Sequence, residues 1–66
     1  MLTLAQKVKY LRRKLHLTTY ELAEKTHISS SYISQIQCGR RIPAADEFYR
    51  LAAALGCSVS YLREGQ

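Results

Sequence analysis

The sequence predicts an all-α fold, a compact domain of five short helices, and three observations carry this prediction. Apolar side chains recur at steps of three and four residues, the spacing of helices rather than of strands. Polar capping residues precede these stretches, and glycines follow two of them. A chain of 66 residues is long enough for one domain. We therefore expect a single domain over residues 1–66, with helices at about 4–15, 19–26, 29–37, 44–55 and 58–64.

The first two predicted helices begin with the same capping signal. In Thr3-x-x-Gln6 and in Thr18-x-x-Glu21, a hydroxyl and a side chain three residues later can satisfy two unpaired backbone N–H groups. An apolar stripe at steps of four, three and four residues follows the first signal: Leu4, Val8, Leu11 and Leu15. Four basic residues fall largely off that stripe: Lys7, Lys9, Arg13 and Lys14.

Serine caps and glycine stops define the third and fifth predicted helices. Ser29 is a good N-cap for the third helix, in which Ile33 and Ile36 face inward, and Gly39 ends it. Ser58 is expected to cap the fifth helix in the same way.

The fourth predicted helix follows Pro43 and ends at Gly56, which we expect in the left-handed conformation. Asp46 and Glu47 in its first turn suit the positive end of the helix dipole. Its inner stripe is expected to be Ala45, Phe48, Ala52 and Leu55, with Leu51 beside it.

The charge of the chain is basic and unevenly distributed. Ten Lys and Arg against five Asp and Glu give a net charge of +5. Residues 1–41 carry eight basic and two acidic side chains, whereas residues 42–66 carry two basic and three acidic ones. This asymmetry is typical of a domain that meets a polyanion on one side.

Several classes of function are not expected. Cys38 and Cys57 form neither a disulfide framework nor a zinc pattern, and His16 and His27 are too scattered to complete a metal site. We expect two reduced thiols, no metal and no cofactor; a redox role for Cys38 is the open alternative. No apolar run approaches the roughly 20 residues of a membrane span, and no signal peptide is present, so we expect a cytoplasmic protein. No nucleophile–base pair or glycine-rich phosphate loop indicates an enzyme.

Residues 19–26 and 29–37 have the spacing of a helix-turn-helix, two short helices joined by about three residues. Ala23 is small enough to let the second helix cross close to the first. No charge occurs between residues 29 and 37, and the outward positions are Ser30, Ser31, Tyr32, Ser34, Gln35 and Gln37. An ordinary surface helix favours Glu and Lys, whereas hydroxyls and amides suit a surface that reads base edges. The alternative is a serine-rich helix without such a role.

Four runs in the sequence match one known pattern: residues 17–25 (LTTYELAEK), 28–36 (ISSSYISQI), 39–43 (GRRIP) and 51–56 (LAAALG). With them the chain, over about residues 4–64, resembles the phage repressor/Cro (XRE-type) helix-turn-helix family. The resemblance implies a lambda-repressor-like DNA-binding fold of five helices, with the third helix in the major groove.

The resemblance also implies roles for individual residues. Ser30, Ser31 and Gln35 match base-reading positions of the third helix, and a glutamine can bond both N6 and N7 of adenine. Contacts to the DNA backbone or groove edge are implied for five residues: Arg12, Thr19, Tyr32, Arg40 and Arg41. For Tyr32 a packing role is equally open.

The chain departs from the family pattern at four positions. Thr19 stands where the family usually has a glutamine that grips the DNA backbone. Gln37 replaces a glutamate that pairs with Arg12 in many relatives, so Arg12 is expected to be less constrained and more available to DNA. His27 replaces a turn glycine and is expected at positive φ, and Ala44 stands where a Ser or Thr cap is common.

The function implied by the resemblance is a sequence-specific double-stranded DNA-binding transcription regulator, in the first place a repressor. Such a regulator binds an inverted-repeat operator as a homodimer, here a weak one until DNA is bound. The alternative is an antitoxin or adaptor that binds a protein partner through an apolar C-terminal patch of Tyr49, Val59, Tyr61 and Leu62. We leave open whether the 66 residues are a whole protein or one domain of a longer chain.

Overall fold

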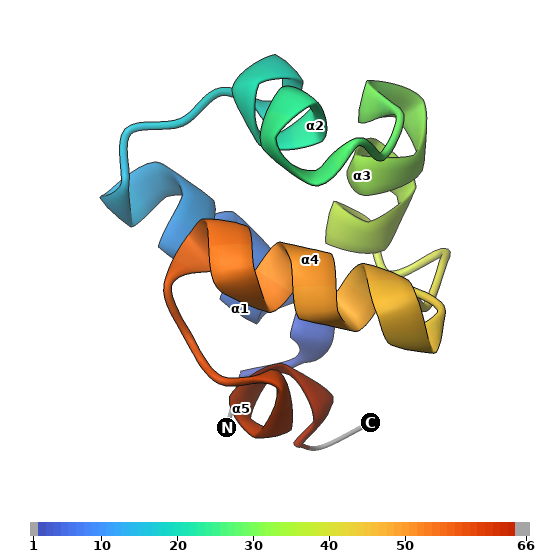
Figure 1. The fold of residues 1–66 in the computed structure, drawn as a ribbon. Helices are drawn as coiled ribbons and strands as arrows, with labels where there is room; N and C mark the ends of the chain where they lie inside the picture. Colours follow the sequence, from blue (N-terminus) through green and yellow to red (C-terminus); the bar gives the residue numbers. More distant parts are fainter. Residues whose placement is uncertain (1, 65–66) are drawn as a thin grey trace.

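A computed structural model describes residues 2–64 of the chain, and its regular elements in that range are five helices. They are α1 (Leu4–Lys14), α2 (Thr19–Thr26), α3 (Ser30–Gln37), α4 (Ala45–Leu55) and α5 (Val59–Arg63). In Figure 1, α4 crosses the middle of the molecule, with α2 and α3 to one side of it and α5 to the other. α3 packs against α1 and α2, and α5 packs against α1 and α4. The all-α prediction is confirmed. No helix of residues 2–64 is long and apolar enough to cross a membrane.

The helices begin where the capping signals indicate. Both predicted capping boxes form, since the Thr3 and Thr18 hydroxyls accept the N–H groups of Gln6 and Glu21 and the reciprocal bonds are also made. The Ser29 and Ser58 hydroxyls likewise accept backbone N–H groups in the first turns of α3 and α5. These cap residues lie just outside the helical bounds, so α3, α4 and α5 each begin one residue later than the predicted ranges.

Left-handed residues end two of the helices. His27 has φ 58° at the end of α2 and Gly56 has φ 71° at the end of α4, as predicted for both. His16, two residues beyond α1, has φ 59°, which the sequence analysis did not anticipate. An L-residue in this region is strained, and histidine is among the side chains that accept it more often.

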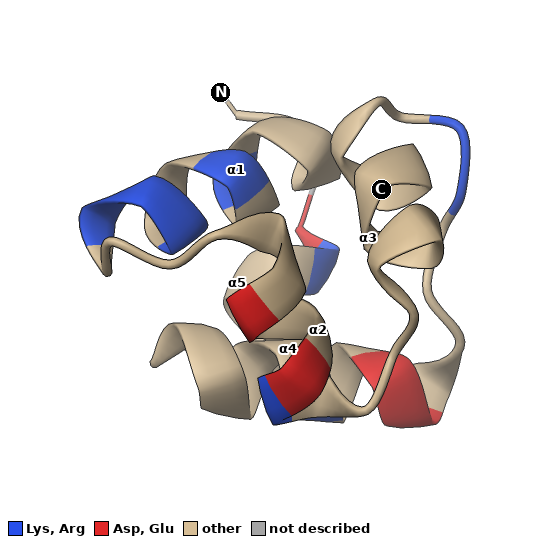
Figure 2. Ribbon diagram, turned by 90° about the horizontal axis from the view of Figure 1, so that it is seen from above, with Lys and Arg blue, Asp and Glu red and all other residues tan. Residues whose placement is uncertain are grey.

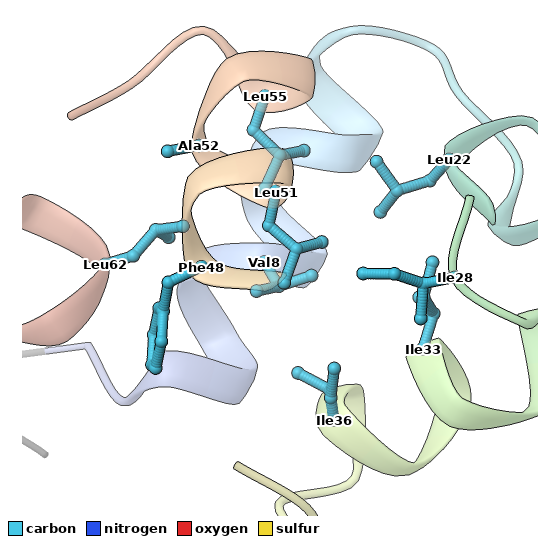
Figure 3. Close-up of a cluster of buried hydrophobic side chains, with 10 residues drawn as sticks. All are labelled: Val8, Leu22, Ile28, Ile33, Ile36, Phe48, Leu51, Ala52, Leu55 and Leu62. Atoms are coloured by element: carbon cyan, nitrogen blue, oxygen red, sulfur yellow. The ribbon is translucent and has the colours of Figure 1, made fainter. Parts of the chain in front are cut away.

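The core contains buried side chains from all five helices and from the turn between α2 and α3 (Figure 3). Its members are Val8, Leu22, Ile28, Ile33, Ile36, Phe48, Leu51, Ala52, Leu55 and Leu62. Two predicted inward positions are wrong. Leu15 is 46% exposed because it is the C-cap of α1, beyond the part of that helix that faces the core. Ala45 is exposed because it is the first residue of α4, before the part of that helix that is buried.

Lys7 is the other residue whose position the apolar pattern did not anticipate. Its side chain is only 2% exposed, although the sequence places it off the apolar stripe of α1. A buried ammonium is stable only where acceptors replace its water, and the backbone oxygens of Tyr61 and Glu64 accept hydrogen bonds from it. α1 and the C-terminal end of α5 are thereby joined.

Candidate nucleic-acid interface

The turn between α2 and α3 is fixed by hydrogen bonds and by buried side chains. The N–H of Ile28 donates to the Ala23 oxygen across the turn at 3.3 Å. Ile33 and Ile36 are fully buried and anchor α3. Thr26 is buried and its hydroxyl bonds back to the Leu22 oxygen at 2.8 Å. The helix-turn-helix geometry that the sequence predicts is therefore present.

Arg50 of α4 supports this turn, a role that the sequence analysis missed. One guanidinium nitrogen donates to the Thr26 oxygen at 3.0 Å, at the C-terminal end of α2. Another pairs with the Asp46 carboxylate, and that hydrogen bond lowers the pKa of Asp46 below its ordinary value. The i, i+4 spacing of Asp46 and Arg50 could have indicated the ion pair, but not the contact with α2.

The surface of α3 carries no charge along its length, as Figure 2 shows, whereas the loop that follows it is basic. Ser31 is exposed at the start of the helix, beside the half-buried Ser30. Gln35 is half-buried one turn later. The loop residues Arg40 and Arg41 are both exposed. Polar groups suited to base edges and cations suited to phosphates thus lie next to one another.

Three of the predicted site residues form one cluster at the end of α3. The Arg41 Nε donates to the Gln35 Oε1 at 2.9 Å. The guanidinium carbon of Arg41 lies 5.2 Å from the centre of the Tyr32 ring, within cation–π range. Hydrogen bonding to the Glu47 carboxylate raises the pKa of Tyr32 above its ordinary value. The half-buried Tyr32 ring therefore packs against Arg41 within this cluster.

A second cluster joins α1, α2 and α3 and corrects the expectation for Arg12. The Arg12 Nε donates to the Gln37 Oε1 at 3.0 Å, and its Nη1 donates to the Leu17 oxygen at 2.7 Å. The Gln37 amide nitrogen in turn donates to the Thr19 hydroxyl at 3.3 Å. Arg12 is thus constrained by hydrogen bonds although residue 37 is a glutamine, because the glutamine oxygen accepts its guanidinium. This network places Arg12 and Thr19 together, apart from the Gln35–Arg41 cluster.

The predicted apolar patch at the C-terminal end is largely absent. Leu62 is fully buried, and Val59 and Tyr61 are partly buried against the core. Only Tyr49 is well exposed, at 64%. These four side chains therefore serve mainly the interior, which leaves the adaptor alternative without its docking surface. Among residues 2–64, no three His, Cys, Asp or Glu side chains lie close enough together to hold a metal ion.

Comparison with known proteins places the chain in one family. The family model described as helix-turn-helix matches residues 8–62. The immunity repressor protein of Bacillus phage phi105 is 37% identical over 59 residues, which cover 89% of this chain and 41% of the phage protein. An uncharacterized HTH-type transcriptional regulator of Sinorhizobium fredii is 42% identical over 48 residues, covering 73% of this chain and 62% of that protein. The chain thus spans about two fifths of the length of the phage repressor it matches.

Solved structures give the same grouping. The P22 c2 repressor in complex with synthetic operator 9T superimposes with a TM-score of 0.93 over the full length of both chains, at 26% identity. A chain of the SinR protein/SinI protein complex superimposes with a TM-score of 0.88 over 96% of this chain and 62% of its own length, at 28% identity.

Proposed function

The chain belongs to the helix-turn-helix family, of the phage repressor/Cro type, and we propose that it is the operator-binding domain of a transcription repressor. In this proposal α3 enters the major groove of double-stranded DNA. The regulator acts by occupying its operator in the bacterial cytoplasm, whether its gene belongs to the bacterium or to a phage.

One observation carries the proposal above the others: an α3 surface without charge, followed directly by a basic loop. A helix stabilised for solubility alone would carry Glu and Lys at its exposed positions. The hydroxyls and amides of α3 match the donors and acceptors of base edges, and Arg40 and Arg41 match the phosphates beside the groove. The P22 c2 repressor, whose fold is so similar, is described in complex with a synthetic operator.

Base reading is assigned to Ser30, Ser31 and Gln35. Serine hydroxyls can donate to or accept from several bases, so the first two are expected to discriminate weakly. Gln35, with a donor and an acceptor on one amide, is expected to discriminate most.

Backbone contacts are assigned to the two clusters and the loop. Arg40 is free to follow a phosphate because its side chain is exposed. Arg12 and Thr19 share one hydrogen-bond network through Gln37, so they are expected to approach the backbone together at the N-terminal end of α2. Tyr32 and Arg41 lie at the groove edge beside Gln35.

The operator is proposed to be an inverted repeat bound by two copies of the chain. Half-sites about one helical turn apart would place two copies of α3 in successive major grooves on the same side of the duplex. The two copies are expected to associate mainly on DNA.

In-vitro selection of duplexes from a random pool, at two salt concentrations, tests the proposal. An inverted repeat with a steep salt dependence supports a dimeric, sequence-specific regulator. Binding without sequence preference overturns the assignment of a repressor, and an absence of binding overturns DNA binding itself.

Two variants and a control make the test specific. Gln35→Ala should relax base choice at one position of each half-site by roughly 1–3 kcal/mol. Arg40→Ala should weaken binding to all sequences and lower the salt slope by about one unit. Arg63→Ala is the control, because it removes the same charge from α5, which packs against α1 and α4. It should change base choice less than Gln35→Ala does and the salt slope less than Arg40→Ala does.

A further inference from the structure

The contact between Arg41 and Gln35 determines which way the Gln35 amide points. A guanidinium has only donors, so the glutamine atom 2.9 Å from the Arg41 Nε must be the carbonyl oxygen. The amide group is planar, and its NH₂ therefore points away from Arg41. The orientation of this side chain is set in the free protein before any DNA arrives.

Arg41 is itself held from two sides. Its guanidinium lies 5.2 Å from the centre of the Tyr32 ring, and Tyr32 precedes Gln35 by one turn on α3. The backbone N–H of Arg40 donates to the Gln35 oxygen of the main chain at 2.9 Å, which ties the loop to the end of the helix. Glu47 of α4 accepts the Ala44 N–H at 2.8 Å, which ties the other end of the loop to α4. The loop and α3 thus fix Arg41 together.

This arrangement changes what Gln35 can offer to a base. Reading adenine requires the amide oxygen to accept from N6 while the NH₂ donates to N7. With its oxygen already accepting from Arg41, Gln35 keeps one acceptor position and two amide donors, and the other N–H groups of Arg41 add further donors beside it. Guanine offers two acceptors, O6 and N7, in the major groove, whereas adenine offers one acceptor and one donor.

We infer that Arg41 is the positioning residue for Gln35 and that the two side chains together select guanine instead of adenine. The inference rests on the proposed function, because it names the base that this site reads. The inference also gives the two loop arginines different roles: Arg40 contacts phosphates, and Arg41 controls base choice through Gln35.

Arg40→Ala and Arg41→Ala form a matched pair for the test, because they remove the same charge from adjacent exposed residues. Arg41→Lys keeps the charge but lacks the planar fork of donors. Four duplexes serve as probes. One is the duplex selected by the wild-type chain, and the other three differ from it at a single base pair, the position at which Gln35→Ala loses base preference. Dissociation constants for the four duplexes are measured with each protein.

We expect the wild-type chain to prefer guanine over adenine at that base pair by about tenfold, the discrimination of one good bidentate contact. Arg41→Ala and Arg41→Lys should both lose this preference or turn it toward adenine. Arg40→Ala should weaken binding to all four duplexes by a similar factor and keep the preference for guanine.

A second readout needs no DNA. The side-chain amide resonances of Gln35 in the free protein should shift in Arg41→Ala and not in Arg40→Ala, while the remaining spectrum reports that the fold is intact. Unchanged Gln35 resonances in Arg41→Ala overturn the inference, as does a wild-type preference for adenine or an Arg41→Ala variant with unaltered base choice. If the wild-type chain prefers no sequence at all, the proposed function fails and the guanine preference fails with it. If the wild-type chain does select a sequence, each of the three contrary results overturns the inference about Gln35 and Arg41 and leaves the proposed function standing.

Discussion

The ammonium group of Lys7 lies 4.4 Å from the centre of the Tyr61 ring and donates a hydrogen bond to the backbone oxygen of the same residue. A second hydrogen bond runs to the Glu64 oxygen at 3.2 Å. These carbonyls lie at the C-terminal end of α5, and the last carbonyls of an α-helix generally need partners from outside the helix. One side chain of α1 therefore caps a helix more than fifty residues later in the chain.

Lys7→Met should lower the free energy of unfolding by roughly 1.5–3 kcal/mol, the cost of losing hydrogen bonds to a charged and buried donor. Methionine keeps most of the apolar stem, so the loss reports on the ammonium group. Urea denaturation followed by circular dichroism measures it. Lys9→Met is the matched control on the exposed side of α1 and should change the free energy by less than about 0.5 kcal/mol. Equal effects of the two substitutions would show that the cap contributes nothing.

Ala44→Ser should stabilise the domain by about 1 kcal/mol, because α4 lacks half of its N-terminal cap. Ala44 has the extended backbone of an N-cap, with φ −69° and ψ 166°, and no side-chain oxygen to accept an N–H. Glu47 already accepts the Ala44 N–H, so a serine hydroxyl would complete a capping box. Thermal or urea denaturation measures the gain. Ala45→Ser, one residue inside the helix, should give no gain, and a gain of the same size there would rule out capping as the cause.

His27→Gly should be more stable than His27→Ala by about 1 kcal/mol, because only glycine adopts the left-handed region without strain. The His27 side chain is exposed, so neither substitution removes core packing. The two variants are compared by their free energies of unfolding. Lys25→Gly and Lys25→Ala, inside α2, should give the opposite order because φ is negative there. The same order at both positions would mean that φ at His27 does not control stability.

Cys38 should react with iodoacetamide several-fold faster than Cys57 at mildly alkaline pH. Burial raises the pKa of the Cys57 thiol, which lowers its fraction of reactive thiolate, whereas Cys38 is exposed. Mass spectrometry of the two cysteine peptides over time measures both rates in one sample. In urea the two rates should approach each other, since the difference depends on the fold. Faster labelling of Cys57 in the folded protein would contradict its position in the structure.

The fold was largely predictable because its signals are local. A capping box needs two residues three apart, and Thr3 and Thr18 make theirs as predicted. The left-handed end of α2 follows from a short turn, so His27 could be assigned positive φ from its place in the pattern. Leu15 and Ala45 were misplaced because periodicity says which side of a helix is apolar but not how far the neighbouring helices extend along it.

The residues of the candidate site stay a prediction from the sequence, whereas the contacts among them could not be predicted from it. The spacing of α2 and α3 and the uncharged sequence of α3 are enough to identify Ser30, Ser31 and Gln35 as outward positions. The contact of Arg41 with the Gln35 amide depends on the path of the loop that follows α3. The contact of Gln37 with Arg12 depends on how α1 packs against α3. Such contacts join residues that no periodicity relates.

By itself, then, the sequence determined the helices, their caps and the family, because each of these depends on residues within a few positions of one another. Only the tertiary structure decided the surroundings of the long polar side chains. Four basic side chains would be expected on the surface from the sequence, yet each donates hydrogen bonds to another part of the fold: Lys7, Arg12, Arg41 and Arg50. The physical reason is that a flexible side chain with several donors bonds to whichever acceptors packing brings within its reach, and packing is settled by the whole core at once.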